Sequence, residues 1–173
     1  MEKLHRLLRN NWRDIVSVCI VIIVVVADQL TKAWIRNNLA VGEVLFDVGI
    51  FRVIHVWNTG AVFGIFKDHS SILLVVAVLG IIAILLLVLL LRKRWPFLYK
   101  MPVMAGIALI LGGTIGNNLF DRVQQGHVTD FIDFKIWPVW NVADSSVTVG
   151  EIIIAIYLII YIFSPGQKND EKL

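Results

Sequence analysis

The sequence predicts an all-α membrane protein in which four transmembrane helices carry a small β-sheet and a short interfacial helix at the outer face of the membrane. Hydrophobic residues make up 58% of the 173 residues, whereas soluble domains contain about 45–50% apolar residues. These residues are gathered into four long runs, and the segment between the first two runs is rich in β-branched and aromatic residues with glycine breaks. The length fits one domain, which we place at residues 1–164, followed by a flexible cytoplasmic tail at 165–173.

Each of the four apolar runs is long enough to cross a bilayer. A spanning helix needs about 20 mostly apolar residues, and only helices and closed barrels satisfy the backbone in lipid. We expect spans at about 13–34, 71–91, 101–121 and 144–163. The first run follows four basic residues and so also fits a signal peptide, but no small-x-small cleavage site comes after it, and we expect it to remain as a helix.

Basic residues are distributed unevenly about these spans. Four spans place both termini on one side, and that side carries four basic residues before residue 14, four at 92–100 and two in the tail, which is 10 of the 16. Because short basic loops stay in the cytoplasm, we expect cytoplasmic termini and outward-facing segments at 35–70 and 122–145. No basic patch is interleaved with aromatic residues, so we expect no nucleic-acid partner.

Both outward-facing segments contain patterns typical of strands. Residues 42–57 combine short β-rich stretches with glycine breaks, and residues 128–136 add a further stretch of this kind. A turn at 58–60 ends the first segment, and the apolar stretch 61–66 then returns to the bilayer as the interfacial helix. We therefore expect a small sheet on the outer membrane surface, with Asp130 in the loop before the fourth span.

Polar residues from separate parts of the chain fall at the outer ends of the spans. They are Asp28 and Lys32 in the first span, Asn117, Asn118, Asp121 and Arg122 at the end of the third, and Asn58, Asp130, Asn141 and Asp144 in or beside the outer segments. Because a charge within a membrane is costly, such a group defaults to a functional hypothesis. Structural alternatives remain, namely an Asp28–Lys32 ion pair, a rim salt bridge between Asp121 and Arg122, and an N-cap formed by Asp144.

The residue types at this depth favour carboxylate chemistry. The four histidines and the single cysteine, Cys19, show no metal-ligand spacing, and Ser145 and Ser146 lack the glycine pattern of a nucleophile elbow, so we expect neither a metal site nor a serine hydrolase. Asp130 and Asp144 remain as a pair that can share one proton. The charged member can then deprotonate a water molecule while the neutral one polarises a carbonyl group. This is aspartic peptidase chemistry, which needs no cofactor.

Two other functional classes stay open on the residues alone. A proton-coupled transporter or channel would use Asp28, Asp130 and Asp144 as relay groups, but it would need carboxylates through the membrane depth, and the inner halves of the spans carry almost none. A non-catalytic scaffold that binds lipid or partner helices would not need two aspartates and three asparagines at one depth.

Five motifs in order make the chain resemble the lipoprotein signal peptidase (signal peptidase II) family over nearly its whole length. They are DQLTK at 28–32, NTGAVF at 58–63, GGTIGNNLFDR at 112–122, GHVTDF at 126–131 and NVADS at 141–145. Any one of them alone is a weak signal, whereas all five in order on a four-span frame are specific.

The third motif departs from the family pattern by one residue. The family has one asparagine between the glycine and Asp-Arg, whereas this chain has two, Asn117 and Asn118. Counting forward from Gly116 selects Asn117 and counting back from Arg122 selects Asn118, so both stay open. We select Asn118 as the site residue because it lies four residues before Arg122, on the same helix face. The extra residue can be absorbed as a π-bulge, a feature that often occurs at functional sites.

The resemblance implies a role for each of these residues. Asp130 and Asp144 would be catalytic, Asn58, Gly60, Asn118, Arg122 and Asn141 would bind substrate, and Asp28 and Lys32 would support the site. The substrate would be a bacterial prolipoprotein with a diacylglyceryl group on its lipobox cysteine, cut just before that cysteine, and globomycin-type cyclic peptides would inhibit the reaction. We expect a monomer surrounded by lipid in the bacterial cytoplasmic membrane, with its site toward the outer face.

Overall fold

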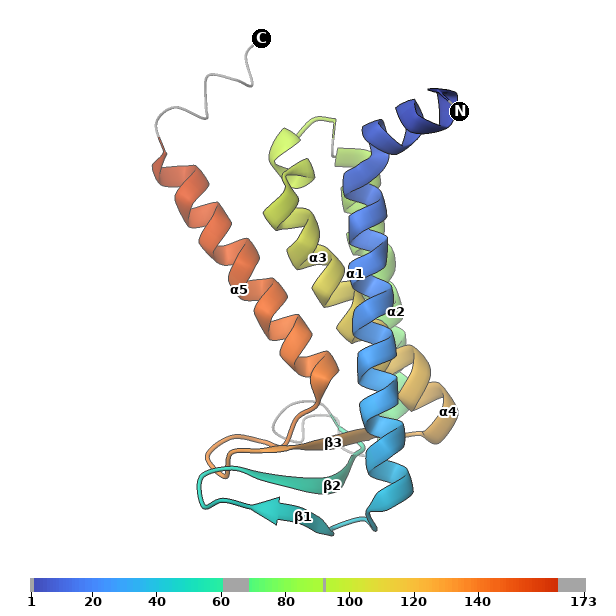
Figure 1. Ribbon diagram of the computed structural model, residues 1–173, viewed down its shortest axis with the longest axis vertical. Coiled ribbons are helices and arrows are strands. Elements are labelled where there is room, and N and C mark those ends of the chain that lie inside the picture. Colours follow the sequence, from blue (N-terminus) through green and yellow to red (C-terminus); the bar gives the residue numbers. More distant parts are fainter. Residues whose placement is uncertain (1, 61–68, 92, 165–173) are drawn as a thin grey trace.

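The computed structural model describes residues 2–60, 69–91 and 93–164, in which four long helices stand on a three-stranded sheet (Figure 1). The long helices are α1 (Glu2–Asn38), α2 (Ser70–Leu91), α3 (Met101–Thr114) and α5 (Val142–Phe163), and a short 3₁₀ helix, η2 (Pro96–Tyr99), precedes α3. The helical path of α3 continues into a π-helix, η3 (Ile115–Arg122), and a last turn, α4 (Val123–Gln125). The strands are β1 (Val44–Asp47), β2 (Arg52–Asn58) and β3 (Val128–Asp133).

The helices are apolar on their outside, as lipid-facing helices are. Four helical stretches are long and apolar enough to cross a membrane, namely Asn11–Asn38, Ser70–Leu91, Met101–Gln125 and Val142–Phe163. No residue of α2 is buried, and large side chains such as Leu90 and Ile23 are mostly exposed. Because lipid rather than water covers such surfaces, the chain is a multi-pass membrane protein and the predicted fold class is confirmed. Three of the four stretches extend at least two residues beyond a predicted boundary, since the helices continue past the apolar runs.

Glycines set the spacing between α3 and its neighbours α1 and α5. A Cβ atom at Gly106 would lie 2.8 Å from the carbonyl oxygen of Gly150 in α5, and one at Gly112 would lie 2.8 Å from the Cβ atom of Val24 in α1. Real side chains do not approach so closely. The glycines of the third span therefore serve helix packing, as small residues do in membranes.

The sheet is antiparallel, in the order β1-β2-β3, and lies across one end of the helices (Figure 1). The predicted strands in both outer segments are confirmed. Asp130 lies within β3, opposite Val56 of β2, so the strand expected at 128–136 includes it and it does not lie in an irregular loop before the fourth span. The strand includes Asp130 because the backbone of β3 pairs with β2 on either side of this position. The predicted interfacial helix at 61–66 and the tail at 165–173 lie outside the described residues.

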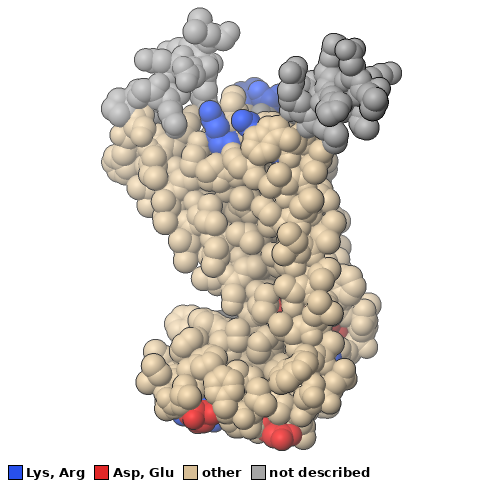
Figure 2. Space-filling view, viewed as in Figure 1, with Lys and Arg blue, Asp and Glu red and all other residues tan. Residues whose placement is uncertain are grey.

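The two ends of the molecule are separated by an apolar belt. α1 begins and α5 ends at the end opposite the sheet (Figure 1). Figure 2 shows charged side chains near that end and again on the sheet, with almost none on the helical surface between them in this view. A small apolar cluster of Ile35, Leu39 and Phe131 fixes β3 against the last turns of α1. The sheet is thereby held at one defined depth.

Candidate active site

A buried ionic cluster lies where α1 meets η3. Lys32 Nζ donates to Asp28 Oδ2 at 2.7 Å and lies 2.8 Å from Asp121 Oδ2, and none of the three side chains is exposed. Gln29 Nε2 donates to Asp121 Oδ1 at 2.9 Å. The Asp28–Lys32 pair expected from the sequence is therefore present. A rim salt bridge between Asp121 and Arg122 is wrong, because Asp121 is fully buried and faces Lys32.

The cluster also binds the backbone of the two elements that carry the paired carboxylates. Asp28 Oδ1 accepts the N–H of Ala143 at 3.0 Å, in the first turn of α5. Asp121 Oδ2 accepts the N–H of Thr129 at 3.3 Å, in β3. A buried, fully paired ion cluster of this kind holds four segments of the chain in one arrangement.

Asp130 is presented by the pairing of β2 and β3. Asn58 lies two residues after Val56, the partner of Asp130, so the two polar side chains occupy diagonal positions on one face of the sheet. Asn58 Nδ2 donates to Asp130 Oδ2 at 2.8 Å, and Asn141 Nδ2 donates to Asp130 Oδ1 at 2.6 Å. The Asp130 side chain is almost completely buried.

Asp144 is presented by the first turn of α5. Asn141, and not Asp144, is the N-cap: its Oδ1 accepts the Asp144 N–H at 3.0 Å, while Asp144 Oδ2 accepts the Asn141 N–H at 3.2 Å. This reciprocal capping box fixes the Asp144 side chain. Asp144 Oδ1 accepts a further bond from Asn117 Nδ2 at 2.7 Å. Asn141 is fully buried, so it contacts both carboxylates from behind.

The electrostatic environment keeps a proton on this pair of carboxylates. Burial, and next the negative charge of Asp144, raise the pKa of Asp130 to about 7, although the amide donors Asn58 and Asn141 partly oppose the shift. Repulsion between two buried carboxylates is the condition under which one of them stays protonated near neutral pH. The arrangement can therefore supply one general acid and one general base.

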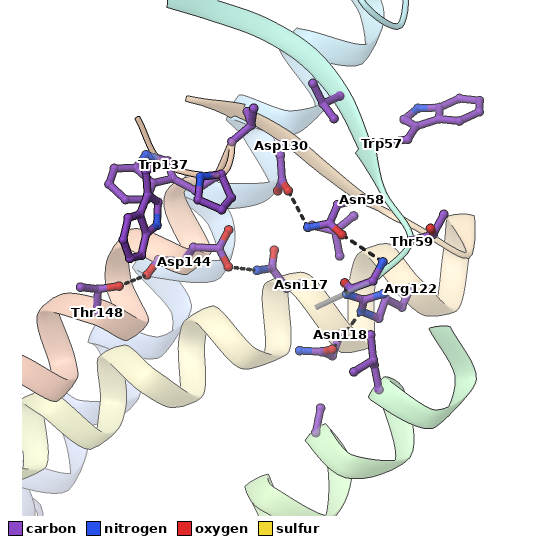
Figure 3. A pocket seen from close by; sticks show the side chains of 18 of the residues that line it. Trp57, Asn58, Thr59, Asn117, Asn118, Arg122, Asp130, Trp137, Asp144 and Thr148 are labelled. Carbon is purple, nitrogen blue, oxygen red and sulfur yellow. Dashed lines mark hydrogen bonds between the residues drawn. The ribbon is translucent and has the colours of Figure 1, made fainter. Parts of the chain in front are cut away.

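A second cluster of polar residues surrounds Arg122, at the end of η3 (Figure 3). Its guanidinium donates to Asn118 Oδ1 at 3.1 Å, to Ser70 Oγ at 3.1 Å and to the carbonyl oxygen of Gly60 at 2.6 Å. The N–H of Gly60 donates to Asn58 Oδ1 at 3.0 Å. Arg122 thus links η3, the start of α2 and the turn after β2, and Asn118 and Arg122 share one face as their spacing predicts.

A cavity of about 780 Å³ lies between the Asp130–Asp144 pair and the cluster around Arg122. Of the residues predicted for the site, Asn58, Gly60, Asn118, Arg122, Asp130 and Asp144 line it. Its apolar wall comes from α2 and from the loop before α5, through Leu73, Val76, Ala77, Trp137 and Val139. Asn141, Asp28 and Lys32 do not line the cavity, because they are fully buried behind it.

The structure adds two residues to those assigned to the site, of which Asn117 was the alternative to Asn118 and Gln29 had been given no role. Asn117 lines the cavity and contacts Asp144, and Gln29 contacts Asp28 and Asp121. The doubled asparagine was the available signal for Asn117, whereas Gln29 had only its position beside Asp28. Within the part of the chain that the structure describes, no three histidine, cysteine or carboxylate side chains are grouped as metal ligands.

Comparisons with known proteins point to one family. Residues 20–160 match the family model for signal peptidase (SPase) II. The chain is 46% identical over 146 residues to a lipoprotein signal peptidase of Dehalococcoides mccartyi, covering 84% of this chain and 90% of that protein. It is 37% identical over 147 residues to a lipoprotein signal peptidase of Clostridioides difficile, covering 83% and 95%.

A solved structure agrees with these relatives. A bacterial membrane enzyme determined by the in meso method at 2.3 Å resolution is similar to this chain with a TM-score of 0.74 and 30% sequence identity. The match covers 83% of this chain and 87% of that one. The similarity therefore extends over most of both chains.

Proposed function

The chain belongs to the signal peptidase II family, and on this premise we propose that it is an aspartic endopeptidase of the bacterial cytoplasmic membrane. It removes signal peptides from diacylglyceryl-modified prolipoproteins and cuts just before the lipidated cysteine. One observation carries the proposal: carboxylates from two separate elements, β3 and α5, line one cavity, and the pKa of one of them is raised to about 7 by burial and by the other's charge.

A shared proton gives each carboxylate its role. Protonated Asp130 donates its proton to the scissile carbonyl oxygen, while the Asp144 carboxylate takes a proton from a water molecule whose oxygen bonds to the carbonyl carbon. The product is a tetrahedral diol. As the C–N bond breaks, Asp144 gives its proton to the leaving nitrogen and one hydroxyl of the diol returns a proton to Asp130. Both carboxylates regain their starting states.

The rest of the cavity supports a lipidated peptide as the substrate. Arg122 and Asn118, with Asn58 and Gly60 at the turn, offer charged and amide groups to a peptide backbone or a lipid head. The apolar wall formed by α2 and the loop before α5 offers a surface for acyl chains. A substrate with a polar scissile bond next to a diacylglyceryl group matches both the polar residues and the apolar wall of the cavity.

The basic residues support an orientation with both termini in the cytoplasm and the sheet at the outer face. Cysteines introduced at Ile50 in the hairpin turn should react with an impermeant thiol reagent in intact cells. Cysteines introduced at Lys93, between α2 and α3, should be protected until the membrane is opened. The reverse pattern would place the site on the cytoplasmic side.

Cleavage of a defined substrate tests the proposed activity. The purified protein in detergent should convert a diacylglyceryl prolipoprotein into two products whose masses place the cut just before the lipidated cysteine. A matched prolipoprotein without the lipid should remain intact, and globomycin should block the reaction. A cut at another bond, or equal cleavage of the unlipidated substrate, would reject the proposed specificity.

A further inference from the structure

The π-helix η3 turns two adjacent asparagines toward different partners. Asn117 lies beside Asp144, whereas Asn118 lies beside Arg122, and both side chains line the cavity (Figure 3). η3 contains the segment in which the chain has one residue more than the family pattern. A π-helix, which can absorb such an extra residue, is therefore present, and within it Asn118 contacts Arg122 while Asn117 places a second amide at the carboxylates.

The contacts of Asn117 fix the direction of its amide. Its Oδ1 accepts bonds from Lys32 Nζ at 2.5 Å and from Asn141 Nδ2 at 3.0 Å. Two donors on the oxygen leave only the nitrogen for the remaining partner, and Nδ2 donates to Asp144 Oδ1 at 2.7 Å. The buried ammonium of Lys32 thus determines which atom Asn117 presents to Asp144.

Asn117 also completes a bridge between the two carboxylates. Asn141 Nδ2 reaches Asp130 Oδ1 at 2.6 Å as well as Asn117 Oδ1 at 3.0 Å, and Asn117 Nδ2 reaches Asp144 Oδ1 at 2.7 Å. Two amides therefore connect one oxygen of Asp130 to one oxygen of Asp144. Because amides are neutral, they can hold the pair in place without supplying the cation that would stabilise both charges.

Asn118 has a separate set of partners. Its Oδ1 accepts from Arg122 Nε at 3.1 Å, and its Nδ2 donates to the carbonyl oxygen of Thr114 at 3.2 Å. Both partners belong to the same helical segment, so Asn118 fixes the Arg122 side chain.

We propose that Asn117 is a positioning residue of the catalytic pair, which orients Asp144 for proton transfer through the donor that Lys32 and Asn141 leave available, and that Asn118 positions Arg122 instead. This inference rests on the proposed function and assigns separate tasks to the two adjacent asparagines. Loss of the Asn117 donor should impair the chemical step, whereas a change at Asn118 should act mainly on substrate binding through Arg122.

Replacement of each asparagine by aspartate gives a matched test. Asn117→Asp keeps an oxygen for Lys32 and Asn141 but removes the N–H donor to Asp144, and Asn118→Asp keeps an oxygen for Arg122. We expect Asn117→Asp to lower kcat about 100-fold, the scale of a displaced catalytic group. The acidic limb of its pH–rate profile should move to higher pH by about one unit. The ionised form of the carboxylate pair is destabilised, because Asp144 loses a hydrogen-bond donor and a negative charge is added nearby. Asn118→Asp should act mainly through Arg122, raising KM about tenfold with a smaller loss of kcat. Asn38→Asp, at an exposed position of α1 away from the cavity, is the control that should leave kcat and the limb unchanged.

The readout separates this inference from the proposed function. Failure of the wild-type protein to cleave the lipidated substrate would reject the proposed function itself. Cleavage by the wild-type protein, with a normal kcat and pH profile in Asn117→Asp, would overturn only the role of Asn117. An equal loss in both variants would overturn the division of tasks. If Asn117→Asp does not purify as a folded protein, Asn117→Ala replaces it in the test. This variant also removes the donor to Asp144 but adds no charge, and its kcat and the acidic limb of its pH–rate profile are measured in the same way.

Discussion

β3 carries two aspartates whose hydrogen-bond donors differ: amides at one end of the strand and an arginine at the other. At the cavity end, which comprises Asn58, Asn117, Arg122, Asp130 and Asp144, Asp130 receives its hydrogen bonds from neutral amides. At the far end, which comprises Asp47, Arg52, Asp133 and Lys135, Asp133 accepts a bond from Arg52 Nε at 2.5 Å. The two aspartates are three residues apart, and both side chains are covered from solvent, but far fewer atoms pack around Asp133 than around Asp130.

Their acidities differ accordingly. Burial, followed by the charge of Asp144, raises the pKa of Asp130 to about 7. Burial also opposes ionisation of Asp133, but hydrogen bonds from the Lys135 N–H and from Arg52 outweigh it and lower the pKa of that group. A buried carboxylate in contact with a cation is a structural ion, whereas one held by amides beside a second carboxylate can transfer a proton at neutral pH. The comparison suggests matched substitutions at the two ends.

The largest expected difference concerns two lysines. Lys32→Met removes the cation from between Asp28 and Asp121, both fully buried, and should destabilise the protein by about 3–5 kcal/mol, as loss of one partner from a buried ion pair does. Lys135→Met breaks an exposed pair with Asp47 and should cost less than about 1 kcal/mol. Thermal unfolding in detergent measures both. Equal effects would mean that the buried cluster does not hold the cavity end together.

Two arginines give the next difference. Arg122→Lys retains the charge but loses the planar fork that reaches Asn118, Ser70 and Gly60, so kcat/KM should fall about 100-fold. Arg52→Lys can still pair with Asp133 and should change kcat/KM less than about threefold. Steady-state cleavage of the lipidated substrate measures both. Wild-type kinetics in Arg122→Lys would show that the planar guanidinium of Arg122 is not needed for substrate cleavage.

The smallest difference is the pH dependence of stability. The raised pKa of Asp130 means that the folded protein binds this proton more tightly than the unfolded chain, so its stability falls as pH rises from about 4 to about 7. Asp130→Asn removes that dependence, and its Tm relative to wild type should increase across this interval by about 5 °C.

Asp133→Asn is the control, with the opposite sign. The lowered pKa of Asp133 contributes stability above the ordinary aspartate pKa that is lost as pH falls, so the Tm of this variant relative to wild type should decrease as pH rises. Parallel trends in the two variants would contradict the contrast between the ends of β3.

The fold was predictable because it depends on hydropathy and length. Runs of about 20 apolar residues admit few structures in lipid, and the strands follow from β-branched and aromatic stretches with glycine breaks. The stretch 128–136 indicated a strand around Asp130, but the pairing of Asp130 with Val56 was not predictable, since it depends on the register of two strands far apart in sequence and on an irregularity between Val53 and Val56. Such long-range pairing leaves no local signal.

The sequence predicted which residues belong to the site better than it predicted the contacts between them. Depth alone grouped Asp130 with Asp144, because each stands near the outer end of a span. Helical spacing correctly joined Asn118 to Arg122, but it gave no direction for Asn117, whose side chain points at Asp144 within a π-helix. Asn141 was expected to bind substrate, yet it caps α5 and is fully buried. Only three-dimensional packing distinguishes an amide behind a site from one that lines it.

The central claim is that Asp130 and Asp144 act together in cleavage, and single-turnover cleavage of a diacylglyceryl prolipoprotein by folded variants tests it most directly. Asp130→Asn and Asp144→Asn should each lose at least about 1,000-fold in rate while still binding globomycin, the scale on which general acid–base groups contribute. The double variant should be scarcely slower than either single one, because members of one catalytic unit are not additive. Asp133→Asn should cleave at the wild-type rate. Near-normal cleavage by either Asp130→Asn or Asp144→Asn would contradict the aspartic mechanism.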